Sequence, residues 1–199
     1  MKKLIAKFKT KKLLVVLVVI IIISFILGIF FPAVLSKTNR SLVNSSLTSF
    51  FLEISKGKLN YAGALISSLC NNLIIDIFVW LIGISIIGIP IIFLVLIFSS
   101  FVLGFSFSSI LMFYGFKGIL ISLIYILPLI INLFVFLITC YYATSFSIML
   151  YNYLFRKKEY SRRIIVSRYI KVLLITCIIL IVSSFIEVFL IPNLLKFLI

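Results

Sequence analysis

The chain has 199 residues, of which 64% are hydrophobic and only 12% are charged. This composition excludes a soluble domain, because several apolar runs exceed the roughly 18 residues that mark a membrane-spanning helix. The formal net charge of +15 would suit a nucleic-acid-binding protein, but the cations flank the apolar runs, where they set topology and contact anionic lipid headgroups. We therefore predict one all-α membrane domain over residues 1–199, with membrane lipids and no nucleic acid as partners.

Metal and disulfide chemistry find no support in the sequence. The chain has no histidine, and its cysteines, Cys70, Cys140 and Cys177, lie far apart without paired spacing. Free cysteine commonly behaves as a small buried hydrophobe. We expect no metal, no cofactor and no disulfide framework.

The N-terminal segment predicts a membrane anchor. Residues 1–12 carry six lysines and no acid, and an apolar run over residues 13–35 follows. That run is too long for the apolar region of a cleaved signal peptide, which has about 7–15 residues. We predict a retained first span whose lysines hold the N-terminus in the cytoplasm.

A polar outer loop over residues 36–71 follows the first span. Within it Phe50, Phe51 and Ile54 interleave with charged and polar residues, a pattern typical of a helix lying on the membrane surface. An ordinary connecting loop is the alternative.

Two spans are predicted next, over residues 73–89 and 90–113, joined by a tight turn at Gly88 to Pro90. In the second of them Ser100, Gly104 and Ser108 recur every four residues. Small residues at this spacing allow another helix to approach closely, so we interpret the stripe as packing and not as a substrate path.

Pro128 divides the next apolar segment, residues 119–155. As a single helix this segment would be about 55 Å long, whereas the hydrocarbon core is about 30 Å thick. We predict a break at Pro128, with a short re-entrant or interfacial helix over 119–127 and a full span over 129–150. Thr139, Ala143 and Ser147 form a second stripe of small residues, and one packing hypothesis has the two stripes facing each other.

The last part of the chain fixes the predicted topology. Residues 152–171 form a basic loop, and a fifth span over 172–190 ends at Pro192. The N-terminal segment and the basic loop hold 13 of the 19 lysines and arginines, and four crossings separate them. Both therefore belong in the cytoplasm, and the C-terminus is expected to be extracytoplasmic.

Asp76 and Glu187 are the acidic residues of the predicted spans, and an ionisable group at membrane depth suggests a functional site. The topology predicts both near the outer surface, on the same side as Lys117. Two roles for Asp76 and Glu187 are therefore open: structural pairing with Lys117, or a path for ions or protons. Without histidine no nucleophile–base pair is evident, so we expect no enzyme activity.

Five motifs carry a family resemblance: W-L-x-G-x-x-x-x-G-I-P, F-V-x-G-F-S, G-x-K-G and I-L-P in the central stretch, and I-E-V-x-x-x-P in the last span. In these motifs and over nearly its whole length the chain resembles the stage II sporulation protein M family. The matching positions are Trp80, Gly83, Gly88, Pro90, Gly104, Gly118, Pro128, Glu187 and Pro192.

The resemblance implies a five-span protein of the bacterial cell membrane that acts at the septum in endospore engulfment. Members of the family anchor or recruit the membrane-tethered, peptidoglycan-degrading sporulation proteins D and P, and those partners perform the murein chemistry. The alternative is a permease subunit with a path near Asp76 and Glu187. Lipid handling by the basic cytoplasmic faces is a third possibility.

Overall fold

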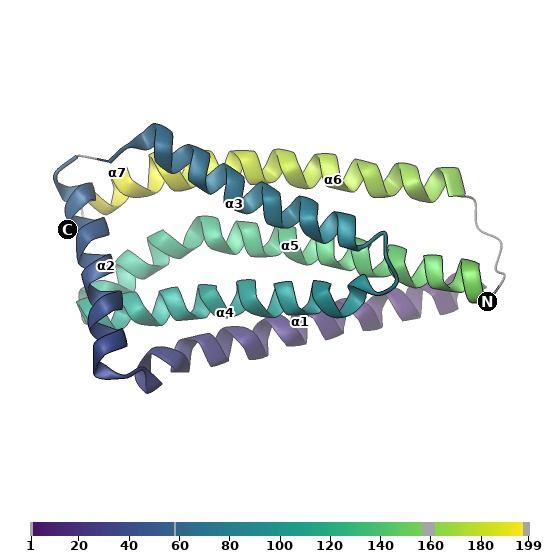
Figure 1. Ribbon diagram of the computed structural model, residues 1–199, viewed down its shortest axis with the longest axis horizontal. Coiled ribbons are helices and arrows are strands. Elements are labelled where there is room, and N and C mark those ends of the chain that lie inside the picture. Colours follow the sequence, from purple (N-terminus) through teal and green to yellow (C-terminus); the bar gives the residue numbers. More distant parts are fainter. Residues whose placement is uncertain (1, 58, 157–161, 197–199) are drawn as a thin grey trace.

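A computed structural model describes residues 2–57, 59–156 and 162–196, and all regular structure in these ranges is helical. Five helices are long and apolar enough to cross a membrane. They are α1 (Lys2–Val34), α3 (Tyr61–Ile82), α4 (Gly88–Tyr114), α5 (Phe116–Arg156) and α6 (Arg162–Phe185). Figure 1 shows them side by side along the long axis, with the two chain ends at opposite ends of the bundle. The predicted all-α bundle of five membrane-spanning helices is confirmed.

The predicted outer loop 36–71 is mostly helical. Helix α2 (Lys37–Ser55) is capped by Ser36, whose hydroxyl accepts from the Asn39 backbone N–H at 3.4 Å. A serine in this position satisfies one of the free N–H groups that open a helix. Figure 1 shows α2 lying across the end of the bundle that also carries the C-terminus.

Aromatic and aliphatic side chains attach α2 to the bundle. Phe51 and Ile54 are only 2% exposed, and they form one buried cluster with residues of α4, α5 and the short C-terminal helix α7 (Ile191–Lys196). The cluster includes Ile110, Ile121, Ile191 and Leu195. Helix α2 is therefore amphipathic, and its apolar side packs like a lid on one end of the bundle.

The predicted break at Pro128 is wrong. Helix α5 continues through Pro128, so residues 119–127 are the first part of a long helix and not a separate re-entrant or interfacial helix. Proline removes one backbone hydrogen bond and can bend a helix without ending it, and Figure 1 shows α5 curving in its first part. Its 41 residues correspond to roughly 60 Å. The first part of α5 extends to the end of the bundle that carries α2, where Ile121 packs under α2.

The predicted turn at Gly88 to Pro90 is also misplaced. Helix α3 ends at Ile82, residues 83–87 form the turn, and Gly88 to Pro90 open α4. Proline suits a first helical turn, where its missing N–H would have no partner. A Cβ on Gly88 would lie 2.2 Å from the Ile82 carbonyl oxygen, so glycine lets the two helix ends meet.

Two other predicted boundaries differ from the helices. Helix α3 begins at Tyr61, well before residue 73, because Asn60 caps it by accepting from the Gly63 N–H at 3.1 Å. The predicted basic loop 152–171 is largely the end of α5 and the start of α6, and residues 157–161 of it lie outside the described ranges. Charged side chains do not stop a helix once it has left the hydrocarbon core.

Two glycines bring α1 and α4 into backbone contact. A Cβ on Gly28 would lie 2.2 Å from the Phe101 carbonyl oxygen, and one on Gly104 would lie 2.2 Å from the Phe25 carbonyl oxygen. The stripe around Gly104 therefore faces α1, whereas Ala143 lies against Gly83 at the end of α3. The hypothesis that the two stripes face each other is wrong, because each contacts a different helix.

Candidate functional site

A line of polar and aromatic side chains runs along α3 where it packs against α6 and α5. Ser68, Asn72, Asp76 and Trp80 recur every four residues, which places them on one face of the helix. Each of them hydrogen-bonds to a residue of another helix. We call this line, together with its partners Thr139, Tyr169, Thr176, Ser184 and Glu187, the polar seam.

Asp76 occupies the middle of the seam and is 0% exposed. The Thr139 hydroxyl of α5 donates to Asp76 Oδ1 at 2.5 Å, and the Thr176 hydroxyl of α6 donates to Oδ2 at 2.8 Å. One carboxyl group thus connects three helices. The predicted position near the outer surface is wrong, because α3 starts earlier than predicted and carries Asp76 deep into the bundle.

The seam ends, on the side away from α2, in a reciprocal pair between Trp80 and Tyr169 of α6. The Tyr169 hydroxyl donates to the Trp80 carbonyl oxygen at 2.6 Å, and the Trp80 indole N–H donates to the Tyr169 carbonyl oxygen at 3.4 Å. The rings of Trp80 and Tyr169 stack with centroids 5.1 Å apart. The ring of Phe146 of α5 also stacks with that of Tyr169, at a centroid distance of 4.4 Å. Trp80 and Tyr169 therefore each pack a ring and also satisfy a backbone carbonyl group.

The end of α3 rests on the small residues of α5. A Cβ on Gly83 would lie 2.3 Å from the Tyr169 hydroxyl oxygen and 2.6 Å from the Ala143 Cβ. Ser147 donates to the Gly83 and Ser85 carbonyl oxygens, at 2.7 and 3.0 Å, which satisfies acceptors that the helix end leaves free. The predicted stripe Thr139, Ala143 and Ser147 is thus a contact surface for α3.

The end of the seam nearer α2 contains Glu187. The Ser68 hydroxyl donates to Glu187 Oε2 at 2.7 Å, and the Asn72 amide N–H₂ donates to the hydroxyl oxygens of Ser68 and Ser184, at 3.3 and 3.2 Å. Asp76 and Glu187 therefore belong to the same seam but occupy different depths. Among the described residues, the exposed Lys117 forms no ion pair with either carboxylate.

A π-helical turn sets the position of Glu187. Residues Ile186–Leu190 form this turn, labelled η1, between α6 and α7, and Pro192 is the second residue of α7. Pro192 has no N–H for the preceding turn, and Asn193 donates its side-chain N–H to the Phe189 carbonyl oxygen at 2.8 Å. Pro192 thus lies within the continuing helical chain, and the prediction that it ends the last span is wrong. Single π-turns occur often at functional sites.

A cavity of about 250 Å³ opens beside Glu187, between α2, α3, α5 and α7. Four residues of the I-E-V-x-x-x-P motif line it, together with three aromatic side chains and polar residues of α3. These lining residues include Glu187, Val188, Ile191, Pro192, Phe50, Tyr61, Tyr125, Ser67, Ser68 and Asn71. An acidic side chain among aromatic rings can bind a cationic or hydrogen-donating group of a ligand.

The hydrogen bonds of the seam hold neighbouring helices together. Both oxygens of Asp76 accept from threonine hydroxyls, and the seam contains no pair of a nucleophile with a basic side chain. Among the described residues, no group of three or more metal-ligating side chains occurs. The untested expectation that the chain is not an enzyme stays an expectation.

Several members of the seam escaped the sequence analysis. Ser68, Asn72, Thr176 and Tyr169 were not singled out, although the four-residue spacing along α3 was visible. That spacing indicates a shared face of α3 but not which helix it meets. The partners on α6 and η1 are far away in the sequence, at separations of 89, 100, 112 and 119 residues.

The family model for stage II sporulation protein M matches residues 16–192. Comparison with curated proteins gave no match, and comparison with solved structures gave none either. The matched range contains the polar seam, the glycine contact between α1 and α4, and the cavity beside Glu187.

Proposed function

Because the chain belongs to the stage II sporulation protein M family, we propose that it anchors and recruits membrane-tethered murein hydrolases in endospore engulfment. The family match and the five apolar helices indicate a sporulation-related multi-pass membrane protein. In the proposal the chain performs no chemistry. Its partners are the D and P proteins of stage II sporulation, at the septal membrane.

The position of the family motif residues supports a rigid anchor. Trp80 and Gly83 hold α3 against α5 and α6, and Gly104 holds α4 against α1. Gly118 at the start of α5 lies against α4, where a Cβ would be 2.9 Å from the Ile110 carbonyl oxygen. The motif thus stabilises contacts between helices. A protein selected to present a fixed surface needs such contacts.

The lid helix α2 supplies a surface for partners. One side of α2 is buried through Phe51 and Ile54, and the other side exposes a row of polar residues. The hydroxyls of Ser41, Ser45, Thr48, Ser49 and Ser55 donate to carbonyl oxygens of their own helix. Because these hydroxyls are satisfied locally, the surface is preformed and does not need a partner to fold.

The direct experiment follows the location of fluorescently labelled D and P proteins in sporulating cells. Deletion of the gene for this chain is expected to disperse both partners around the membrane. Thr48→Arg on the exposed face of α2 should weaken recruitment, whereas Leu174→Ala on the apolar surface of α6 should leave it unchanged. Correct partner localisation in the deletion strain would contradict the proposal.

The polar seam gives a specific reason to test the permease alternative. A line of hydrogen-bonding groups across a membrane domain resembles a path for ions or protons. Asp76 is, however, fully buried and held by two hydroxyl donors. A permease requires that Asp76→Asn abolishes flux in reconstituted vesicles while the bundle still assembles, and an anchor requires no flux in the unaltered chain.

A further inference from the structure

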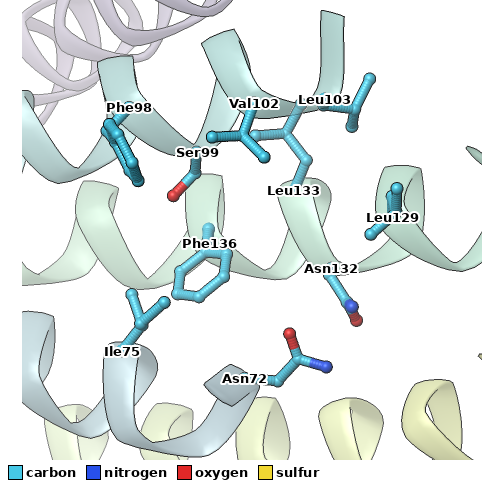
Figure 2. Close-up of a pocket in the computed structure, with 10 residues that line it drawn as sticks. All are labelled: Asn72, Ile75, Phe98, Ser99, Val102, Leu103, Leu129, Asn132, Leu133 and Phe136. Atoms are coloured by element: carbon cyan, nitrogen blue, oxygen red, sulfur yellow. The ribbon is translucent and has the colours of Figure 1, made fainter. Parts of the chain in front are cut away.

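A second pocket lies at mid-depth, where α3 and α4 diverge over α5. Its volume is about 180 Å³, and Figure 2 shows its lining side chains coming from these three helices. The lining residues lie near the middle of α3 and α4, far from the ends of both helices. The pocket is distinct from the cavity beside Glu187 and shares no lining residue with it.

Asn132 of α5 is the unexplained group of this pocket. It is 4% exposed, and neither its amide nitrogen nor its carbonyl oxygen has a hydrogen-bond partner. Figure 2 shows the carboxamides of Asn132 and Asn72 pointing toward each other across the pocket. A buried carboxamide without partners is costly, so its retention at membrane depth indicates a missing hydrogen-bonding group.

Asn72 adds an acceptor to the same space. Its amide nitrogen already donates to Ser68 and Ser184, whereas among the described residues no donor reaches its carbonyl oxygen. The pocket therefore offers two carboxamide oxygens and one N–H₂ group. Asparagine or glutamine is the side chain that can donate two hydrogens and accept one at the same place.

Apart from Ser99, whose hydroxyl donates to the Val95 carbonyl oxygen at 2.9 Å, the remaining walls are apolar and limit the choice of occupant. Ile75, Val102, Leu103, Leu129, Leu133 and Phe136 surround the carboxamides. A lipid acyl chain would fit these walls but could not hydrogen-bond to Asn132. Water could also bond to Asn132, and a pocket that holds only water would not distinguish a polar helix from an apolar one in the test below.

The mouth of the pocket opens toward the surrounding membrane. Phe98 on α4 is 68% exposed and Val102 is 41% exposed, so this face of the bundle meets whatever lies beside it in the bilayer. Helix association in membranes depends on close packing and on hydrogen bonds between helices. A neighbouring helix can pack along Phe98 and Val102 and insert one side chain.

We propose that this pocket binds the membrane-spanning helix of a partner protein through one asparagine or glutamine at the middle of that helix. The inserted carboxamide pairs with Asn132 and Asn72, and its apolar stem contacts Leu133 and Phe136. The identity of the partner as a tethered murein hydrolase rests on the proposed function. The binding of a carboxamide side chain rests only on the residues that line the pocket.

The chemical test uses the purified full-length chain in vesicles of phosphatidylethanolamine and phosphatidylglycerol. Energy transfer reports binding of a synthetic leucine–alanine helix that carries one central glutamine, and the control helix carries leucine there. The glutamine helix is expected to bind about tenfold more tightly, a difference of about 1.4 kcal/mol. Asn132→Leu should remove that preference. Equal binding of both helices, or a preference unchanged in the variant, would overturn the proposal.

Stability measurements separate binding from folding. Because Asn132 has no partner within the chain, Asn132→Leu should not lower the melting temperature of the purified protein. Asn72→Leu should lower it, since Asn72 holds Ser68 and Ser184. A loss of stability in Asn132→Leu would mean that Asn132 already has a structural role, and would contradict the proposal.

A photocrosslinking residue at position 98 tests in sporulating cells whether a partner helix lies at the pocket. Position 174 on α6 is the control. The expected adduct maps to the spanning segment of a partner, near an asparagine or glutamine, and disappears in Asn132→Leu. Adducts to lipid alone, or to a second copy of the chain, would overturn the inference. An adduct to the spanning segment of a protein other than D or P would leave the inference intact and contradict the proposed function.

Discussion

At the scale of single residues, the few polar side chains of this apolar chain lie where helices meet. Asp76 contacts Thr139 and Thr176, and Glu187 contacts Ser68. A hydrogen bond between membrane helices contributes modestly, about 0.6 kcal/mol on average and about 1.7 kcal/mol at most. Its larger effect here is to fix register, because a shift of α3 by one residue would leave the Asp76 carboxyl group facing apolar side chains.

The threonines of the seam can be tested with isosteric variants. Thr139→Val and Thr176→Val each remove one donor from a fully buried carboxyl group, and each is expected to cost about 1–2 kcal/mol of unfolding free energy. Denaturant unfolding in mixed micelles measures the loss. Ser41→Ala, at an exposed hydroxyl on α2, is the control and should change stability little.

Gly83 offers a second residue-scale test. Gly83→Ala places a methyl group against the Tyr169 hydroxyl and Ala143, so we expect a loss of about 1–3 kcal/mol from overpacking. The matched control is Gly63→Ala in the first turn of α3, where only the side chain of Asn60 is near. Alanine favours helix over glycine by about 1 kcal/mol, and the Asn60 side chain must shift slightly to admit the methyl group, so that variant should change stability less than Gly83→Ala. Equal effects of the two changes in thermal unfolding would contradict this account.

At the scale of elements, the chain combines spans of unequal length with one helix across the end of the bundle. Helix α5 is much longer than the hydrocarbon core, and its first part shares a buried cluster with α2 and α7. The tight reversal at Gly115, with a φ of 57°, returns the chain directly from α4 into α5. A positive φ of this kind favours glycine. The cluster thus joins α2, α7 and the adjacent ends of α4 and α5 into one platform.

The attachment of α2 depends on its buried aromatic residue. Phe51→Ala removes a side chain that is 2% exposed, and such a change commonly costs about 3–5 kcal/mol in a packed core. We expect α2 to detach before the bundle unfolds, with faster amide hydrogen exchange over Lys37–Ser55 alone. The neighbouring Leu52→Ala, at a side chain that is 47% exposed, should leave the exchange rate unchanged. Faster exchange throughout all helices of Phe51→Ala would show that α2 is not a separable unit.

At the scale of the whole molecule, five crossings place the two chain ends at opposite ends of the bundle. The distribution of lysine and arginine then predicts which end is cytoplasmic. On this prediction the α2 platform and the cavity beside Glu187 are extracytoplasmic, where peptidoglycan lies.

Labelling of single cysteines in intact cells tests this orientation, in a chain whose three native cysteines are replaced by serine or alanine. Cysteine at Lys37 should react with a membrane-impermeant maleimide, and cysteine at Lys12 should react only after the cells are opened. The reverse pattern would place the platform in the cytoplasm and would exclude contact with extracytoplasmic hydrolases.

The sequence by itself determined the class of the protein and the number of its spans. Long apolar runs have only one solution in a bilayer, a helix that satisfies its own backbone, so composition and run length sufficed. The same reasoning misjudged Pro128 and the segment Gly88 to Pro90, because a proline's effect depends on whether neighbouring helices support the chain around it. The family motifs were visible as letters, but their roles were not.

Only the tertiary structure decided which faces meet. Gly104 faces α1, Ala143 faces α3, and Asp76 lies between α5 and α6, although every one of these residues is carried on an equally apolar helix. In a bilayer the lipid and the protein interior are similarly apolar, so hydropathy does not separate the inner face of a helix from the outer one. Contacts between residues about 100 positions apart make that distinction, and they arise when the helices pack.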